Sequence, residues 1–403
     1  MDKQEASFKM VAKTFAGLEK VLAEEIRELG GKEIKTVQRA VEFTGDDALM
    51  YRTNYQCRSA IRILKPIAEF YAPNENVLYD EVKKIAWDNY LDISNTFSVD
   101  GHVSYSHITH SKYLALKSKD AIADQFREHT GKRPSVDKFN PDLRINVRIF
   151  KNFCTVSIDG SGESLHRRGY RKSTGPAPLN EVLAAGMILL TGWKGDTNFI
   201  DPMCGSGTLA IEAAMISKNM PAGMFRESWA FQGWKDFDSG LWEQVTSEAK
   251  SRIGPLSIKV VASDRSGRIL QVARENIEAA GLTNDIEVKV DFIGDVVPPP
   301  GGGLMVTNPP YGERIKSDDI NKLYADIGDN LKQQFVGYNA WIISSHMEAT
   351  KHIGLRPAAH MPLNNGALAC KYLGFEIYEG SKKDKQEPAE KTKQNKVQFR
   401  RNR

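Results

Sequence analysis

The 403-residue sequence contains only four cysteines, and none of them forms a C-x-x-C pair. Cys57, Cys154, Cys204 and Cys370 are widely separated, which argues against a disulfide framework and a structural zinc site, so no metal is expected. No apolar run reaches the roughly 18 residues that a membrane-spanning helix needs. The polar N-terminus, MDKQEASFKM, is unlike a secretory signal. We therefore expect a cytoplasmic protein without membrane contacts.

Positive charge is scarce in the body of the chain and is concentrated at its end. Residues 381–403 contain nine Lys/Arg and three Asp/Glu, a charge of +6, so the net charge of +4 leaves −2 for the remainder. Proteins that bind nucleic-acid backbones often carry such a basic tail, but solvated termini have the same composition. We expect residues 381–403 to be a disordered tail.

The first 160 residues or so mix helix-like and strand-like segments without regular alternation, which is typical of an α+β unit. Helical periodicity or composition is present at 17–29, 78–90 and 112–128, and strand-like patterns at 33–43, 59–70, 143–150 and 153–159. From about residue 176 strands and helices alternate, and residues 363–377 could add two final strands. This alternation predicts a doubly wound α/β sheet, so the catalytic domain should be C-terminal.

Residues 201–208, with the sequence DPMCGSGT, form a glycine turn between a predicted strand and a predicted helix. The glycines allow a tight turn and a close approach to a ligand. A G-x-G motif alone is equally compatible with a structural turn, and the absence of a following lysine disfavours a phosphate loop. The preceding acid, Asp201, suits a positively charged ligand such as a sulfonium methyl donor with an α-amino group.

Three further segments contain candidate donor-binding residues. Asp264 ends the next strand, where a carboxylate can accept both ribose hydroxyls, although a helix cap is the alternative reading. Asp291 and Phe292 end another strand and could contact the donor's adenine, or could be a plain strand terminus. Asn180 and Glu181 precede a helix and could close over the methionine end or simply cap that helix.

The strongest motif is NPPYG at residues 308–312, directly after the hydrophobic strand 303–306. An exocyclic amine on a base is a poor nucleophile, because its lone pair is delocalised into the ring. Asn308 can offer its side-chain oxygen, and Pro309 its backbone oxygen, as acceptors for the amine hydrogens. Pro309 and Pro310 stiffen the backbone, and Tyr311 can stack on an extruded base. An ordinary strand-ending turn is the alternative.

A basic segment joins the two halves of the chain. His166, Arg167, Arg168, Tyr170 and Arg171 suit phosphate contact and base stacking, and the alternative is an exposed linker. An insertion near residues 218–255 is rich in aromatic residues, which we expect to form a local core rather than a base-stacking platform.

Together these motifs resemble the THUMP-domain RNA N2-guanine methyltransferases, above all the methyltransferase unit of the RlmL-type 23S rRNA enzymes and their single-unit relatives. The resemblance covers about residues 6–380 and rests on DPMCGSGT, on SD at 263–264, on NPPYGER, and on PLNE and LHRRGYR. It implies a ferredoxin-like region (1–64), a THUMP domain (65–165) and a Rossmann-like methyltransferase domain (166–380) with a mostly parallel seven-stranded sheet. The second methyltransferase unit of the fused enzymes is not expected.

The resemblance also implies that S-adenosyl-L-methionine is the cofactor and that RNA is the partner, and 23S rRNA or a pre-ribosomal particle is the expected RNA. The expected cofactor-binding set is Asp201, Pro202, Cys204, Gly205, Gly207, Thr208, Asp264, Asp291, Phe292, Asn180 and Glu181. The expected catalytic set is Asn308, Pro309, Pro310 and Tyr311. The expected reaction is methylation of a guanine N2 amine. A tRNA guanine-N2 methyltransferase, a DNA adenine-N6 methyltransferase and an inactive RNA-binding relative are the alternatives.

Overall fold

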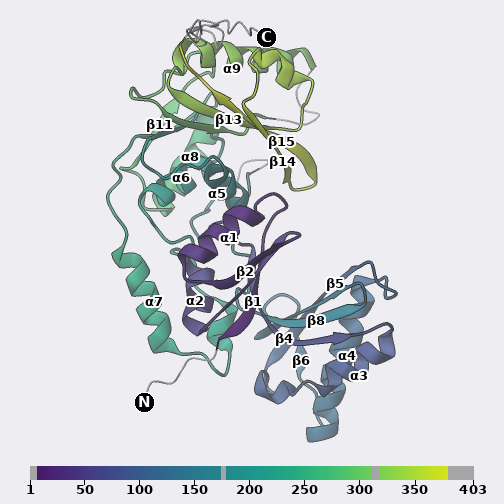
Figure 1. The fold of residues 1–403 in the computed structure, drawn as a ribbon. Helices are drawn as coiled ribbons and strands as arrows, with labels where there is room; N and C mark the ends of the chain where they lie inside the picture. The colour runs from purple at the N-terminus through teal and green to yellow at the C-terminus, as the bar shows by residue number, and fades with distance from the viewer. Residues whose placement is uncertain (1–6, 174–177, 311–316, 380–403) are drawn as a thin grey trace, which may run out of the picture.

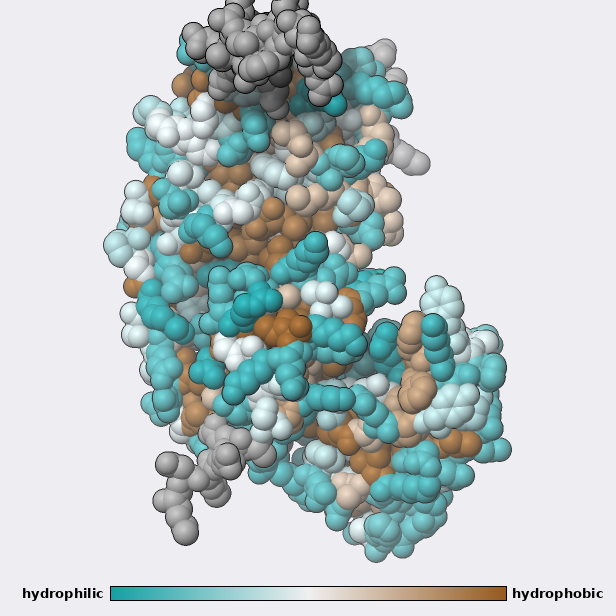
Figure 2. Space-filling view, viewed as in Figure 1, coloured by the Kyte–Doolittle hydropathy of each residue, from teal (hydrophilic) through white to brown (hydrophobic). Residues whose placement is uncertain are grey.

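The computed structural model describes residues 7–173, 178–310 and 317–379. The ribbon shows a sheet-and-helix body at the top, a second body below it, and a lobe beside the lower body (Figure 1). The space-filling view shows a notch between this lobe and the upper part of the molecule (Figure 2). No helix within the described ranges is both long enough and apolar enough to cross a bilayer. Tyr311 and the expected basic tail, 381–403, lie outside the described residues.

The N-terminal region has the element order strand-helix-strand-strand-helix-strand. It comprises β1 (Phe8–Lys13), α1 (Glu19–Glu28), β2 (Lys32–Val37), β3 (Ala40–Gly45), α2 (Asp47–Gln56) and β4 (Arg62–Tyr71). Its strands lie in the order β2-β3-β1-β4 and all pair antiparallel. This is the arrangement of a ferredoxin-like unit. Leu22 and Ile26, on the apolar face of α1, join a buried cluster with Met10 and Phe43 of the sheet.

The second region supplies the lobe in Figure 1. It comprises α3 (Glu75–Lys84), η1 (Trp87–Asn89), β5 (Thr96–Ser104), α4 (Ser111–Thr130), β6 (Ser135–Val136), β7 (Leu143–Phe150) and β8 (Phe153–Asp159). The α4 helix packs on α3 and on β5. It ends at Gly131, whose φ of 71° is the left-handed conformation that glycine adopts most easily at a helix terminus. The sequence pattern predicts α4, β7 and β8 closely, but not β5.

Strand β4 belongs to both N-terminal regions. It pairs with β1 through residues 62–64 and with β8 along residues 64–71. The two regions therefore share one eight-stranded sheet, in the order β2-β3-β1-β4-β8-β7-β5-β6. The expected boundary between residues 64 and 65 falls inside this strand. The boundary remains a prediction from the sequence. The backbone hydrogen bonds between β4 and β8 begin at residue 64 and continue to residue 71, on the other side of this boundary.

The C-terminal domain has the doubly wound sheet that the alternating pattern predicts. Its elements are α5 (Glu181–Leu190), β9 (Asn198–Asp201), α6 (Thr208–Ser217), η2 (Ala230–Gly233), α7 (Ser239–Ser251), β10 (Val260–Asp264), α8 (Gly267–Ala279), β11 (Ile286–Val290), β12 (Gly303–Thr307), α9 (Ser317–Gln334), β13 (Tyr338–Ser344), η3 (Ala349–Ile353), β14 (Ala359–Asn365) and β15 (Leu368–Glu376). The strand order is β11-β10-β9-β12-β13-β15-β14, and among these described strands only β15 runs in the opposite direction, pairing antiparallel with both β13 and β14. The expected seven-stranded, mostly parallel sheet is confirmed.

The aromatic residues of the insertion in this domain pack against one another and also against the N-terminal region. Trp229, Phe231 and Trp234 are buried in one cluster with Tyr51 and Tyr55 of α2. The rings of Tyr51 and Phe231 stack with their centroids 4.7 Å apart. A core is thus confirmed over a base-stacking platform, but this core joins two regions of the chain. Figure 1 shows α7, within the insertion, beside α2.

Candidate active site

Four predicted site residues lie at one edge of the C-terminal sheet. Asp201 and Asp264 are the last residues of β9 and β10, and Asp291 and Asn308 directly follow β11 and β12. These strands are parallel neighbours, so their carboxyl ends lie side by side. The chain leaves β9 toward β10 on one side, and β12 lies on the other side. Ligands of doubly wound sheets bind beyond the strand ends at such a switch point.

The glycine turn after β9 adopts a left-handed backbone conformation that glycine reaches most easily. Gly205 and Gly207 have φ values of 53° and 84°, and the Gly207 N–H donates to the Cys204 carbonyl at 2.8 Å. A Cβ on Gly207 would lie 3.3 Å from the Cβ of Ala273, whereas a Cβ on Gly205 would meet no atom within 4 Å. Gly207 therefore serves close packing against α8, and Gly205 faces open space in which a ligand can approach the backbone.

Asp264 connects the glycine turn to the next strand. Its Oδ2 accepts a hydrogen bond from the Gly205 N–H at 3.2 Å, and its Oδ1 accepts one from the Ser266 N–H at 2.9 Å. The cap of α8 is Ser266, whose hydroxyl accepts from the Ile269 N–H. Asp264 is therefore not the residue that caps the helix. Each of its oxygens keeps a lone pair for a further donor, such as a hydroxyl.

Asp201 is buried and is held by the neighbouring strand. Its Oδ1 accepts from the Thr307 hydroxyl at 2.9 Å and from the Met203 N–H at 3.2 Å. The pKa of Asp201 is raised to about 7, chiefly by burial and in part by the nearby Asp264, against the lowering effect of the two hydrogen bonds. A cation bound nearby would favour the ionised form. The sequence gives no signal for Thr307, which reads as one more residue of a buried strand.

Asn308 carries a buried acceptor that is not satisfied. Its Oδ1 is buried and has no hydrogen-bond partner among the described residues. Pro309 is buried and Pro310 is exposed. Asn308 directly follows Thr307, whose hydroxyl donates to Asp201, so the backbone of Asn308 lies close to the buried acid. Leaving such an acceptor unpaired costs about 1–3 kcal/mol, so an external hydrogen-bond donor at this strand end would stabilise it, which keeps Asn308 a candidate site residue.

The expected role of Arg168 and Tyr170 in RNA binding is wrong for this structure. Both side chains are only 1% exposed. The Arg168 guanidinium pairs with Glu212 of α6 at 3.3 Å, and the Tyr170 hydroxyl donates to the same carboxylate at 3.0 Å. They form a buried polar contact between the segment that joins the two halves and the helix after the glycine turn. His166 is half-buried and Arg167 is exposed, so only these two stay candidates for RNA contact.

Arg171 also points inward, toward the glycine turn. Its Nη1 donates to the Ser206 hydroxyl at 3.1 Å, its Nη2 to the Thr208 hydroxyl at 2.9 Å, and its Nε to Glu181 at 2.7 Å. Arg171 is therefore a positioning residue for the turn and not a phosphate contact. Asn180 caps α5 by accepting from two backbone N–H groups, so the cap reading holds for Asn180.

Asn276 of α8 is a positioning residue that the sequence analysis missed. Its side-chain oxygen accepts from the N–H groups of Lys172 and Ser173, and its side-chain nitrogen donates to the carbonyls of Ser173 and Ser206. It is 1% exposed. One amide thus joins the basic segment to the glycine turn. No motif points to it, because an asparagine within a helix is common.

Phe292 is 38% exposed beside the half-buried Asp291, whose N–H donates to the Asp264 carbonyl. A ring at this strand end is accessible to a planar ligand.

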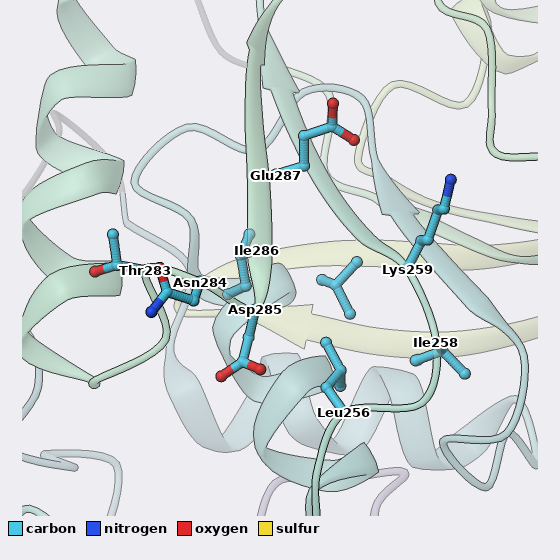
Figure 3. Close-up of a pocket in the computed structure, with 9 residues that line it drawn as sticks. Leu256, Ile258, Lys259, Thr283, Asn284, Asp285, Ile286 and Glu287 are labelled. Atoms are coloured by element: carbon cyan, nitrogen blue, oxygen red, sulfur yellow. The ribbon is translucent and has the colours of Figure 1, made fainter.

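A hollow of about 400 Å³ lies at the opposite edge of the sheet, where Val260 and Ile286 begin β10 and β11 (Figure 3). It is therefore distinct from the edge that carries the predicted site. Within the described residues, no three His, Cys, Asp or Glu side chains form a metal-binding cluster.

Three family models match the chain. Residues 9–64 match the RlmL ferredoxin-like domain, residues 72–159 the THUMP domain, and residues 168–373 the RMKL-like methyltransferase domain. A Synechocystis protein provisionally named an RNA methyltransferase is 40% identical over 364 residues, covering 90% of this chain and 95% of that protein. The ribosomal RNA large subunit methyltransferase K/L of Syntrophotalea carbinolica is 40% identical over 388 residues, covering 93% of this chain and 54% of that protein. The chain thus spans about half the length of this K/L relative.

Solved structures agree with these matches. A provisionally named methyltransferase complexed with SAH is 28% identical, with a TM-score of 0.84 over 94% of this chain and 100% of that chain. A Listeria monocytogenes protein named a predicted N6-adenine-specific DNA methylase is also 28% identical, with a TM-score of 0.83 over 92% and 97%. The methyltransferase model alone covers half of the sequence, and the Synechocystis relative is covered almost end to end. This chain belongs to the RMKL-like methyltransferase family, with ferredoxin-like and THUMP domains before the methyltransferase domain.

Proposed function

We propose that this protein transfers a methyl group from S-adenosyl-L-methionine to the N2 amine of a guanine in RNA, with 23S rRNA as the substrate. The observation that carries the proposal is the buried, unpaired Oδ1 of Asn308 at the carboxyl end of β12. The names of the curated relatives support an RNA substrate and ribosomal RNA in particular. The THUMP match supports RNA binding by the N-terminal half.

The residues at the carboxyl edge of the sheet fit the methyl donor. When bound, S-adenosylmethionine supplies an electrophilic methyl group on a positively charged sulfur. The Asp264 carboxylate can accept the ribose hydroxyls with the lone pairs that Gly205 and Ser266 leave free. Asp201 provides negative charge close to the turn, and the open space at Gly205 admits a ligand. The solved relative that holds SAH supports the same donor.

Asn308 can activate the amine without removing its proton first. Its side-chain oxygen accepts one amine hydrogen, which draws the nitrogen lone pair out of conjugation with the base. The nitrogen then forms a bond to the methyl carbon, the carbon–sulfur bond breaks, and sulfur keeps that electron pair. The nitrogen becomes cationic and loses a proton to water. Because Pro309 and Pro310 restrict the backbone, the acceptor needs little reorganisation during this step.

Asn308→Ala tests this proposal. We expect methyl transfer to fall by about 100-fold or more, as when one pre-organised hydrogen-bonding group is removed from an active site. Donor affinity, measured by calorimetry, should stay within about threefold, because Asn308 acts on the acceptor base. Asn339→Ala is the matched control, since Asn339 is exposed at the amino end of the adjacent strand β13. An equal loss of donor binding and turnover in Asn308→Ala would contradict the role.

The substrate is tested by incubating the protein with labelled donor and with 23S rRNA, tRNA or DNA separately. Mass spectrometry of the digested nucleosides should find N2-methylguanosine from the ribosomal RNA. Preferential labelling of tRNA would contradict 23S rRNA as the substrate but leave guanine-N2 methylation as the reaction. N6-methyladenine in DNA would contradict both the RNA substrate and the guanine-N2 reaction. The name of the Listeria relative makes this the principal alternative.

A further inference from the structure

Four aromatic side chains gather at one end of the sheet in the second region. Tyr71, Tyr105 and Phe153 are 51%, 82% and 63% exposed, and Phe150 is half-buried. We refer to Tyr71, Tyr105, Phe150 and Phe153 as the aromatic row. Large apolar rings at this level of exposure gain nothing from the protein core, and contiguous exposed apolar groups mark interaction sites.

The strand register places Tyr71, Phe150 and Phe153 on one face of the sheet, and Tyr105 joins them through its ring contact with Phe150. Phe153 of β8 is the cross-strand partner of Phe150 on one side and of Tyr71 on the other. The Tyr71 and Phe153 rings have centroids 5.5 Å apart, and those of Tyr105 and Phe150 lie 5.8 Å apart. Residues paired directly across strands point to the same face. The opposite face of this end holds Ile149 and Cys154, which are buried in the core.

The backbone that carries part of the row is held by a tight turn and by side-chain hydrogen bonds. Lys151 and Asn152, with φ values of 50° and 63°, form the two-residue turn between β7 and β8. The Asn152 Oδ1 accepts from the Ser106 hydroxyl at 2.8 Å and from the His107 N–H at 2.9 Å, which ties the loop after β5 to this turn. Tyr105, in that loop, has a φ of 51°, which is uncommon for a bulky residue and persists only where the surroundings impose it.

Two cations accompany the rings. The Arg148 guanidinium and the Lys151 ammonium lie 5.4 Å and 5.6 Å from the centroid of Phe150. Both are exposed, and neither forms an ion pair within the described part of the chain. Glu69, on the same face of β4, is paired with Lys9 at 3.5 Å. The positive charge beside the row is therefore available to an anionic partner.

We propose that the aromatic row is a stacking site for unpaired bases of RNA, with Arg148 and Lys151 contacting the adjacent phosphates. Rings that present their faces or edges beside cations suit single-stranded nucleic acid, whose bases stack while its backbone carries the negative charge. A duplex keeps its bases stacked internally and offers only phosphates and groove edges. The row therefore selects single-stranded segments. This inference rests on the proposed RNA substrate and deepens it.

Binding of the full chain to a labelled oligoadenylate, alone or annealed to oligouridylate, tests the proposal by fluorescence anisotropy. We expect Phe153→Ala and Tyr71→Ala each to weaken binding to the single strand by about fivefold or more, and binding to the duplex by less than about twofold. Phe139→Ala is the matched control, because Phe139 is 92% exposed and stands outside the row. It should leave both affinities unchanged. Thermal unfolding confirms that each variant is folded.

Salt dependence separates stacking from phosphate contact. Arg148→Gln should reduce the slope of log affinity against log salt for the single strand by about 0.7, whereas Phe153→Ala should leave that slope unchanged. Wild-type single-strand affinity in both aromatic variants, or equal losses for the two forms of RNA, would overturn the stacking site, and the first result would point to a protein partner. If the wild-type chain bound neither form, the stacking site would be overturned, whereas the proposed methylation of 23S rRNA is decided separately by the labelled-donor assay.

Discussion

Asp201 is an acid that burial keeps near half-protonation at neutral pH. Its pKa is about 7, well above the ordinary 3.8. A sulfonium donor favours the ionised carboxylate, so below pH 7 binding must release a proton from the protein. We expect donor affinity at pH 6 to be about tenfold weaker than at pH 8, because each pH unit below the pKa reduces the ionised fraction about tenfold. Calorimetry at the two pH values measures this difference.

Asp201→Asn is the control for that prediction, since it cannot titrate. Its donor affinity should be equal at the two pH values, and a persisting tenfold difference would assign the pH effect to another group. Without the donor, the folding stability that Asp201 contributes changes with pH in the opposite direction to the donor affinity. The folded state retains the Asp201 proton up to about pH 7, so the stability that this group contributes falls as pH rises from about 4 to about 7. Denaturant unfolding of the wild type and of Asp201→Asn should show this slope only in the wild type.

Residue types alone placed the acids and the amide of the site, but not the direction of the basic side chains. Asp201, Asp264 and Asn308 follow buried strands, and parallel strand ends must meet at one edge. Arg168 and Arg171 looked like a phosphate-binding cluster, because several of their partners on α6 and the glycine turn lie more than 30 residues away in the sequence. Arg168 pairs with a carboxylate 44 residues further along the chain, which no local pattern reveals.

At the level of elements, the contact between α2 and the aromatic insertion is the main junction of the fold. Phe231 is fully buried and stacks on Tyr51 of α2. Phe231→Ala should lower the free energy of unfolding by about 3–5 kcal/mol, because it leaves a large cavity. Phe139→Ala, at an exposed position, should change that free energy by less than about 0.5 kcal/mol. Urea unfolding monitored by circular dichroism measures both, and a loss below about 1 kcal/mol for Phe231→Ala would show that the junction does not stabilise the fold.

Most strands and helices of the C-terminal domain could be predicted because their apolar runs alternate regularly and many end near glycine or proline, but α7, within the aromatic insertion, was not predicted. Helix α2 could not, because it is buried on most sides and has no polar face that would reveal a helical period. Its start had a local signal, since Asp46 accepts a hydrogen bond from the Leu49 N–H. Because the aromatic insertion packs on α2, and α2 was not predicted, the contact between the two regions was not predicted either.

At the scale of the whole molecule, the regions are joined by polar contacts as well as by the shared core. Arg58, which precedes β4, is buried and donates to the carbonyls of Met215 and Met220 at the end of α6. Glu212, on the same helix, receives Arg168 and Tyr170. These contacts connect the helix after the glycine turn to the ferredoxin-like region.

We therefore expect the described regions to unfold in one cooperative transition, seen at the same denaturant concentration by tryptophan fluorescence and by circular dichroism. Glu212→Gln should lower the free energy of unfolding for this single transition by about 3–5 kcal/mol, because it leaves the buried Arg168 without its counter-charge. Arg167→Gln, which removes an exposed cation paired with Glu163, should change little. Two separate transitions, or a shift in only one of the signals, would contradict the expectation.

The strand shared by the two N-terminal regions has a consequence for how a substrate is chosen. The β4 strand is hydrogen-bonded to β1 at its start and to β8 up to Tyr71, so the lobe cannot swing freely without breaking ladder bonds. With the stacking site proposed above, the distance between Tyr71 and Asn308 is then nearly constant. The protein would therefore select a guanine by its distance from an unpaired RNA segment, and not by the sequence of the nucleotides between them.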